Sequence, residues 1–192
     1  MILSNVEIQK AIDEGCLVID PEPTPRTVTT DDPYCPFGTT SVDLRLGDSI
    51  SIPGPGPFVY DLRQGGIAKF LSRNSTHITL PTGGYVLEPK VFVLGTTLER
   101  VSLPITQEKQ VLAARIEGKS SFARCGLLVH FTAPTVHAGF EGRLTLEMIN
   151  LGNSAILLLS GMPICQLILE MVSGGPQANP SQFQGQATPS GT

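Results

Sequence analysis

The sequence contains no tryptophan, few other aromatic residues and few charged ones. Aromatic residues make up 6% and charged residues 16% of the 192 residues, while hydrophobic residues reach 41%. This hydrophobic share is ordinary for a globular protein, and the length suits one domain with a core of its own. The net charge of −4 and the lack of a Lys/Arg-rich stretch argue against a nucleic-acid polymer as partner, because phosphate backbones need clustered cations.

Cysteine is also scarce, and the sequence lacks long hydrophobic runs. The four cysteines have neither the CxxC spacing of a zinc site nor the density of a disulfide framework, so we expect buried thiols and no metal held by protein ligands. No run approaches the ~20 apolar residues of a membrane helix. Met1-Ile2-Leu3-Ser4 shows no basic leader or cleavage site of a secretory signal. We therefore expect a cytoplasmic protein without a membrane partner.

Glycine (20) and proline (16), by contrast, are abundant, which favours many turns between short elements. Ser4 and Glu7 have the spacing of a capping box and predict a short N-terminal helix that ends near Gly15. Residues 21–39 are proline-rich and predict an irregular surface excursion. The remaining pattern predicts an antiparallel sandwich or jelly roll, with strands at 17–19, 41–46, 49–52, 76–80, 85–87, 91–96, 111–116, 127–131, 144–150, 155–159 and 164–172.

Within this plan, Gly47-Asp48 is expected to turn the chain between two strands. The last segment, residues 173–192, has low complexity, and its composition alone is typical of a disordered C-terminus.

Three stretches concentrate polar groups between apolar strands. In the first, residues 115–124, a glycine turn followed by Lys119, Ser120 and Ser121 suits phosphate oxygens, although an ordinary capped turn has the same pattern. It lacks the first glycine of a P-loop, which argues against Walker-type ATP binding. In the second, residues 144–150, alternation places Glu147 on the face opposite three apolar residues. A partly desolvated carboxylate is suited to acid–base chemistry, but a solvated outer face fits the same pattern equally well.

The third stretch, residues 132–140, is an irregular link that contains His137. This histidine is a candidate base, although a surface loop histidine is the commoner outcome. A zinc deaminase would need an H-x-E string and a P-C-x-x-C string, and neither occurs. A carboxylate with a hydrogen-bonded water is then the remaining route to hydrolysis.

Taken together, these stretches resemble the dCTP deaminase branch of the dUTPase-like family, and the resemblance covers nearly the whole chain. It rests on motifs in the family's order: residues 2–4, 15–21, 41–47, 117–124, 132–133, 139–142 and 144–147. The resemblance implies a distorted jelly roll with a short N-terminal helix, assembled as a homotrimer with active sites between subunits. It implies a domain over residues 1–172 and a tail, residues 173–192, that closes over bound nucleotide.

The resemblance also implies the reaction: zinc-independent hydrolysis of dCTP to dUTP and ammonia. Glu147 resembles the general base, and Ser120 and Arg124 resemble the pair that positions the water and holds Glu147 ionised. Magnesium is expected to arrive with the triphosphate, and dTTP is a candidate inhibitor. The family pattern assigns substrate binding to Lys119, Ser121, Thr132, Ala133, His137, Phe140, Gln166 and Gln186.

Two departures from the family pattern bear on activity. His137 stands where dUTPases carry an aspartate that supports attack on the α-phosphate, so it counts against dUTP diphosphatase or bifunctional activity. Gln182 and Phe183 stand where relatives often have Lys and Tyr, which predicts a weaker grip on the triphosphate. The alternative from another class is a non-catalytic trimeric nucleotide sensor, and a plain structural jelly-roll protein ranks last.

Overall fold

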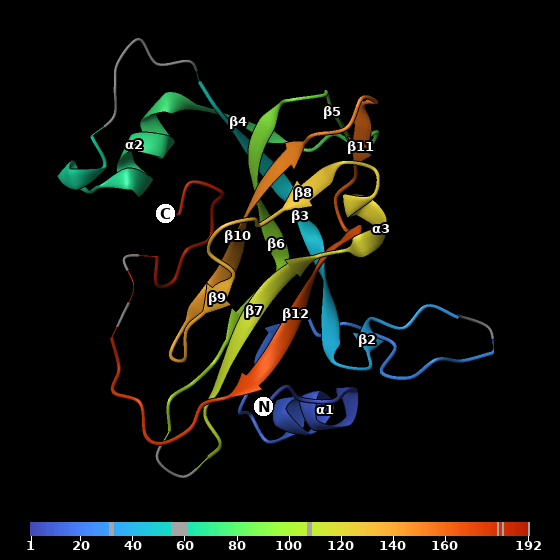
Figure 1. Ribbon diagram of the computed structural model, residues 1–192, viewed down its shortest axis with the longest axis vertical. Helices are drawn as coiled ribbons and strands as arrows, with labels where there is room; N and C mark the ends of the chain where they lie inside the picture. The colour runs from blue at the N-terminus through green and yellow to red at the C-terminus, as the bar shows by residue number, and fades with distance from the viewer. Residues whose placement is uncertain (31–32, 55–60, 107–108, 180, 182, 192) are drawn as a thin grey trace.

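The computed structural model describes residues 1–30, 33–54, 61–106, 109–179, 181 and 183–191. Strands dominate these residues, and every strand pair is antiparallel (Figure 1). The strands are β1 (Val18–Asp20), β2 (Phe37–Gly38), β3 (Ser41–Pro53), β4 (Ser75–Thr79), β5 (Tyr85–Leu87), β6 (Phe92–Ser102), β7 (Leu112–Gly118), β8 (Leu127–Val129), β9 (Thr135–Val136), β10 (Glu141–Asn150), β11 (Ile156–Leu158) and β12 (Pro163–Met171). The mainly β architecture is thereby confirmed.

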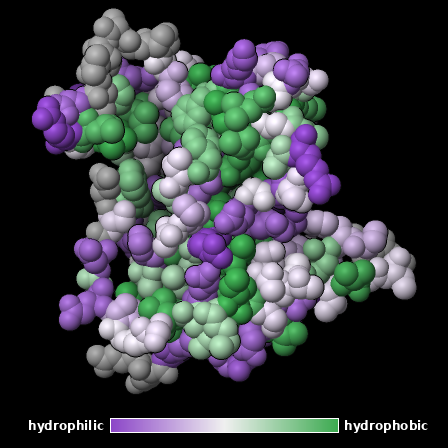
Figure 2. Space-filling view, viewed as in Figure 1, coloured by the Kyte–Doolittle hydropathy of each residue, from purple (hydrophilic) through white to green (hydrophobic). Residues whose placement is uncertain are grey.

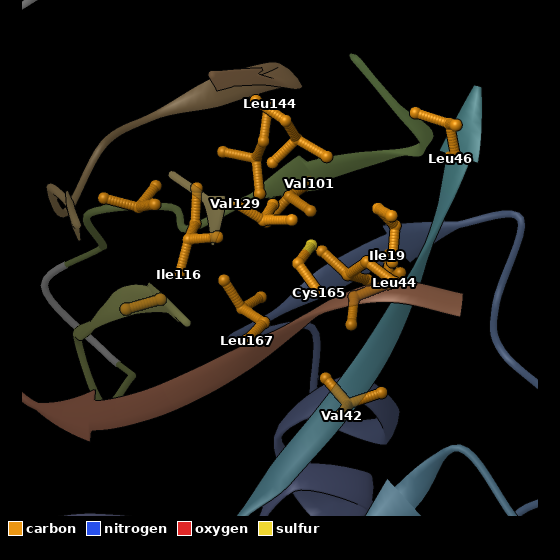
Figure 3. Close-up of a cluster of buried hydrophobic side chains, with 14 of the residues drawn as sticks. Ile19, Val42, Leu44, Leu46, Val101, Ile116, Val129, Leu144, Cys165 and Leu167 are labelled. Atoms are coloured by element: carbon orange, nitrogen blue, oxygen red, sulfur yellow. The ribbon is translucent and has the colours of Figure 1, made fainter. Parts of the chain in front are cut away.

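In the described part of the chain, ten strands form one sheet in the order β8-β10-β6-β3-β12-β7-β9, with β1 on β6 and with β2 and β4 on β3. Strands β5 and β11 pair with each other. The long sheet curls, so that β7 comes back towards β8: a Cβ at Gly118 would lie 3.6 Å from the carbonyl oxygen of Val129. The curled sheet encloses the core, in which Val42, Leu44 and Leu167 from neighbouring strands meet (Figure 3).

The N-terminal helix α1 (Asn5–Asp13) forms as predicted. The Ser4 side chain accepts from the Glu7 amide, and Ile8 and Ala11 on one face of the helix are buried. Gly15 follows with φ 67°, a conformation that glycine adopts at little cost. In Figure 1 the helix lies at the lower end of the sheet, below β12.

The predicted turn at Gly47-Asp48 is wrong, because β3 continues through it as one strand of 13 residues. The chain is irregular at this point only in its strand pairing, because the β3–β6 register shifts between Leu46 and Ile50. A Cβ at Gly47 would lie 3.0 Å from the carbonyl oxygen of Thr96, so glycine is needed for the close approach of β6 rather than for a turn.

Several elements were not anticipated from the sequence, including strand β2 in the segment predicted to be irregular and the short helix η1 (Leu62–Gln64). Helix α2 (Ile67–Asn74) has no buried residue, and strand β9 lies in a stretch that reads as an irregular link. Two short helices, η1 and α3 (Ser120–Ala123), complete the fold, and α3 lies in the predicted phosphate-type turn. Across the described residues, no helix has the length and hydropathy needed to cross a membrane.

Candidate active site

A cavity of about 480 Å³ opens beside β10, between the segment that contains β9, helix α2 and the C-terminal tail. Residues from all four contribute to its walls. They include Ile67 and Leu71 of α2, Thr145 and Glu147 of β10, residues 133 and 135–140, and tail residues such as Gln186 and Ser190, and His130 lines the cavity as well. The walls are largely apolar, with a few polar groups facing inward, which is the usual make-up of a small-molecule site.

The alternation of β10 places Glu147 in this cavity. Leu144, Leu146 and Met148 are buried in the core, and Thr145 and Glu147 on the other face line the cavity, to whose wall Leu144 also contributes. The Glu147 side chain is 31% exposed. The solvated outer face that the pattern also allowed is therefore excluded, and the carboxylate lies in a partly desolvated position.

His130, directly after β8, is the closest charged partner of Glu147. Its Nδ1 lies 2.8 Å from Oε2 of Glu147, and its side chain is 9% exposed. Its Nε2 lies 2.7 Å from the carbonyl oxygen of Ala133, which can only accept, so Nε2 carries a hydrogen. Two unprotonated acceptors at 2.8 Å would repel each other, so one proton is shared between Nδ1 and the carboxylate.

The protonation states of the pair follow from its surroundings. Burial is the largest single effect on both groups, and it disfavours charge on each. The hydrogen-bonding and Coulomb interactions between the partners outweigh burial. Together they lower the pKa of Glu147 and raise the pKa of His130. Glu147 is therefore an ionised carboxylate at neutral pH, as a general base must be.

Four of the predicted substrate-binding residues line the same cavity as Glu147: Ala133, His137, Phe140 and Gln186. Phe140 also packs against the hydrophobic core, so its ring has a fixed place in the wall. His137 is exposed, and among the described residues its side chain has no hydrogen bond or ion pair. Thr132, one residue before Ala133, is exposed and lies outside the lining of the cavity.

The tail packs over this cavity and against the start of β10. The Gly185 amide donates to the Glu141 carbonyl at 2.7 Å, and the Arg143 amide donates to the Gln186 carbonyl at 2.9 Å. The Gln186 side chain adds a bond of 2.7 Å to the Arg143 carbonyl, and this residue is only 8% exposed. These contacts hold residues 185 and 186 against the start of β10, and closure of the tail over bound nucleotide stays a prediction. Gln182, one of the two departures from the family pattern, lies outside the described residues.

The remaining predicted residues lie elsewhere on the chain. Lys119 caps α3, and Ser120, Ser121 and Arg124 on or next to this helix are exposed. Figure 1 shows α3 on the opposite side of the sheet from the tail. The Arg124 side chain makes no hydrogen bond or ion pair with any residue that the structure describes. A single chain therefore does not bring Ser120 and Arg124 to Glu147, and their catalytic role stays a prediction.

A second polar cluster lies next to α3 and centres on Asp43 of β3. The Lys119 ammonium pairs with Oδ2 of this carboxylate, and the Gln166 amide donates to Oδ1 at 3.2 Å. Tyr34 donates its hydroxyl hydrogen to Oδ2 at 3.0 Å. The carboxylate is almost fully enclosed, with Asp43 6% exposed.

Sequence reasoning missed three residues of these two sites: His130, Asp43 and Tyr34. Asp43 left a signal, because alternation places it on one strand face together with Ser41 and Arg45, which is unusual for a strand so rich in core residues. His130 left none, since nothing in one sequence shows that it faces Glu147 across a strand pair.

The fold and the cavity define a β-sheet protein that holds an ionised carboxylate in a small-molecule site. The chain belongs to the dCTP deaminase-like family, whose family model matches residues 2–172. A dUMP-forming dCTP deaminase of Methanosphaera stadtmanae is 33% identical over 198 residues, covering 98% of this chain and 91% of the relative. A dCTP deaminase of Rhodospirillum rubrum is 36% identical, covering 88% of this chain and 82% of the relative.

A solved structure shares the fold. The 2′-deoxycytidine 5′-triphosphate deaminase from Agrobacterium tumefaciens superposes with a TM-score of 0.61 at 22% identity. The match covers 89% of this chain and 48% of the solved chain, so the present chain spans about half the length of that protein. The predicted jelly-roll-like fold is thereby confirmed.

Proposed function

We propose that the protein hydrolyses dCTP to dUTP and ammonia, as the names of its relatives suggest. The observation that carries the proposal is the ionised carboxylate of Glu147 in an otherwise largely apolar cavity, held by His130. A general base of this kind activates water without a metal ion of its own. Among the described residues, no group of three or more His, Cys, Asp or Glu side chains is arranged to hold a metal ion.

In the proposed mechanism, Glu147 takes a proton from a water molecule as the water oxygen bonds to C4 of cytosine. Glu147 then delivers this proton to N3, giving a tetrahedral intermediate with a hydroxyl and an amino group on C4. Transfer of the hydroxyl proton to the amino group breaks the C4–N4 bond and releases ammonia. His130 supports each step, because its positive charge keeps Glu147 ionised between proton transfers.

The pyrimidine and the sugar are assigned to the cavity and to the chain segment directly beside it. Backbone groups of Thr132 and Ala133 are proposed to read the pyrimidine edge, and the fixed ring of Phe140 to support the deoxyribose, which leaves little room for a 2′-hydroxyl. Gln186, at the docked part of the tail, is proposed to close over the nucleotide as a lid, since lids exclude water from the reacting centre.

We further propose a homotrimer in which a second copy completes the site. Ser120 and Arg124 then come from the neighbouring chain, which accounts for their distance from Glu147 within one chain. Exposed apolar residues such as Val86, Leu151 and Leu157 favour association, and Figure 2 shows apolar side chains gathered over the upper end of the sheet, near β8 and β10.

The triphosphate is assigned to Lys119, Ser121 and Gln166, with Mg²⁺ bound through the nucleotide. dTTP is proposed as a competing ligand, because it shares the deoxyribose and the triphosphate. A cytoplasmic location is proposed as well. It is supported by the free thiols of all four cysteines in the described part of the chain, which fit a reducing compartment.

A second candidate is formation of dUMP and pyrophosphate from the dUTP product. The name of the Methanosphaera relative favours it. His137, which lines the cavity, counts against it, because the resemblance to dUTPases implies an aspartate at this position that supports attack on the α-phosphate.

The experiment that tests the proposal is incubation of the purified protein with dCTP and Mg²⁺, followed by separation of ammonia, dUTP, dUMP and pyrophosphate from one sample. Ammonia with accumulating dUTP is the expected result. Ammonia with dUMP and pyrophosphate would support the second candidate. Protection of the tail from proteolysis by dCTP, without any turnover, would favour a nucleotide sensor instead.

A further inference from the structure

The proline-rich excursion of residues 21–39 is anchored to the body of the protein. Arg26 forms ion pairs with Glu22 at 2.5 Å and with Asp13 of α1 at 2.8 Å. The Gln9 side chain donates to the Arg26 carbonyl at 2.8 Å. These contacts hold the start of the excursion against helix α1.

The excursion brings Tyr34 to the Asp43 cluster next to α3. The phenol hydroxyl donates to Oδ2 of Asp43, the same oxygen that pairs with Lys119, while Tyr34 as a whole residue is 42% exposed. Burial, followed by the negative charge of Asp43, raises the pKa of Tyr34 above its usual range. The hydroxyl therefore keeps its proton at physiological pH and acts as a donor.

The donors around the Asp43 carboxylate leave Lys119 only partly engaged. Oδ1 accepts from Gln166, and Oδ2 accepts from both Tyr34 and Lys119. Because Tyr34 occupies part of the acceptor capacity of Oδ2, Lys119 gives one of its three hydrogens to the carboxylate, and the other two can bind an incoming anion. The Lys119 side chain is 20% exposed, so part of it remains open to solvent.

We propose that Tyr34 is a positioning residue for triphosphate binding, which holds the Asp43 carboxylate so that Lys119 presents its ammonium to the phosphates. The inference rests on the proposed function, since it takes Lys119 as a triphosphate contact. Without the hydroxyl, Asp43 is free to turn and to accept a second hydrogen from Lys119. The ammonium is then less available to phosphate, while the base and sugar pocket beside Glu147 is unchanged.

The test is Tyr34→Phe, which removes only the hydroxyl, with Val28→Ala on the same excursion as the matched control, because Val28 is exposed. Deamination of dCTP is measured with inorganic tripolyphosphate as a competing inhibitor. In Tyr34→Phe we expect KM for dCTP and Ki for tripolyphosphate to rise by the same factor, about fivefold to tenfold, with kcat within about twofold. Val28→Ala should match the wild type in KM for dCTP, in Ki for tripolyphosphate and in kcat.

Unchanged KM and Ki in Tyr34→Phe would overturn the inference. So would a fall in kcat at constant Ki, which would indicate a general structural effect, or a failure of tripolyphosphate to inhibit the wild type. If the wild type releases no ammonia from dCTP, the proposed function fails instead. Calorimetric binding of tripolyphosphate to the three proteins then still decides the role of Tyr34.

Discussion

Replacing His130 with asparagine should destabilise the protein in a pH-dependent way. Asparagine tolerates the left-handed backbone of this residue, φ 54°, so the substitution removes the imidazole without straining the chain. At 2.8 Å from Glu147, an effective dielectric constant of about 20 gives a gross attraction of about 6 kcal/mol. Burial of both groups offsets most of this, and we expect a net loss of about 1–2 kcal/mol in the free energy of unfolding.

The pH window follows from the directions of the two shifts. The pKa of His130 is raised from 6.5, so its contribution is complete below that value and is lost as pH rises through the higher folded pKa. The pKa of Glu147 is lowered from 4.5, so its contribution is present above that value and is lost as pH falls through the lower folded pKa. The difference between wild type and His130→Asn should therefore be largest between pH 4.5 and 6.5.

The assay is urea unfolding at a series of pH values and one protein concentration, because association would add its own free energy. His77→Asn is the matched control, since His77 is exposed on β4 and has no carboxylate partner among the described residues. A difference between His130→Asn and wild type that stays constant from pH 5 to pH 9 would refute the ion pair as the source of the stability.

Three further predictions concern the base, the subunit arrangement and the tail. Glu147→Gln should lower kcat by at least about 10²-fold and change KM for dCTP only a few-fold, as steady-state ammonia release would show. Arg124→Ala should be inactive alone. An equal mixture of Arg124→Ala and Glu147→Gln chains, unfolded and refolded together, should regain about a quarter of wild-type activity. In the proposed trimer, a site is complete when one chain keeps Arg124 and its neighbour keeps Glu147, which random mixing gives at about one site in four. No recovery would mean that one chain supplies both residues. Gly142 has φ 153°, and in Gly142→Ala the new Cβ would lie 3.0 Å from the Gln186 carbonyl oxygen. We therefore expect faster proteolysis of the tail and a higher KM for dCTP. A tail as well protected as in the wild type would show that this packing is not required.

Local patterns were sufficient to predict most strands and the first helix. Alternation located β10 with Glu147 on one face, and the capping pair at Ser4 and Glu7 located α1. The errors arose where tertiary contacts override local preference. Gly47 signals a turn by its residue type, but in the fold it permits the approach of β6. Helix α2 has a weak local signal, and its Ile67 and Leu71 face the cavity rather than the core.

The candidate site was predictable residue by residue but not as an arrangement. The resemblance to a family identified Glu147, Phe140 and Gln186, which the fold gathers around one cavity. The resemblance implied a site between subunits, but it could not show that α3, with Ser120 and Arg124 on or next to it, lies on the opposite side of the sheet from the tail, because that placement is set by the fold of the whole chain. Tyr34 was also out of reach, since its role depends on the path of an irregular excursion to a carboxylate on another strand.

The most direct test of the account is to let the protein act on dCTP in oxygen-18 water and to analyse the nucleotide product by mass spectrometry. Water activated by Glu147 and added to C4 predicts dUTP with one heavy oxygen on the uracil ring and one ammonia released for each label. Ammonia release without label in the ring, or label found only in the phosphates, would contradict the mechanism. Absence of any product would contradict the proposed activity itself.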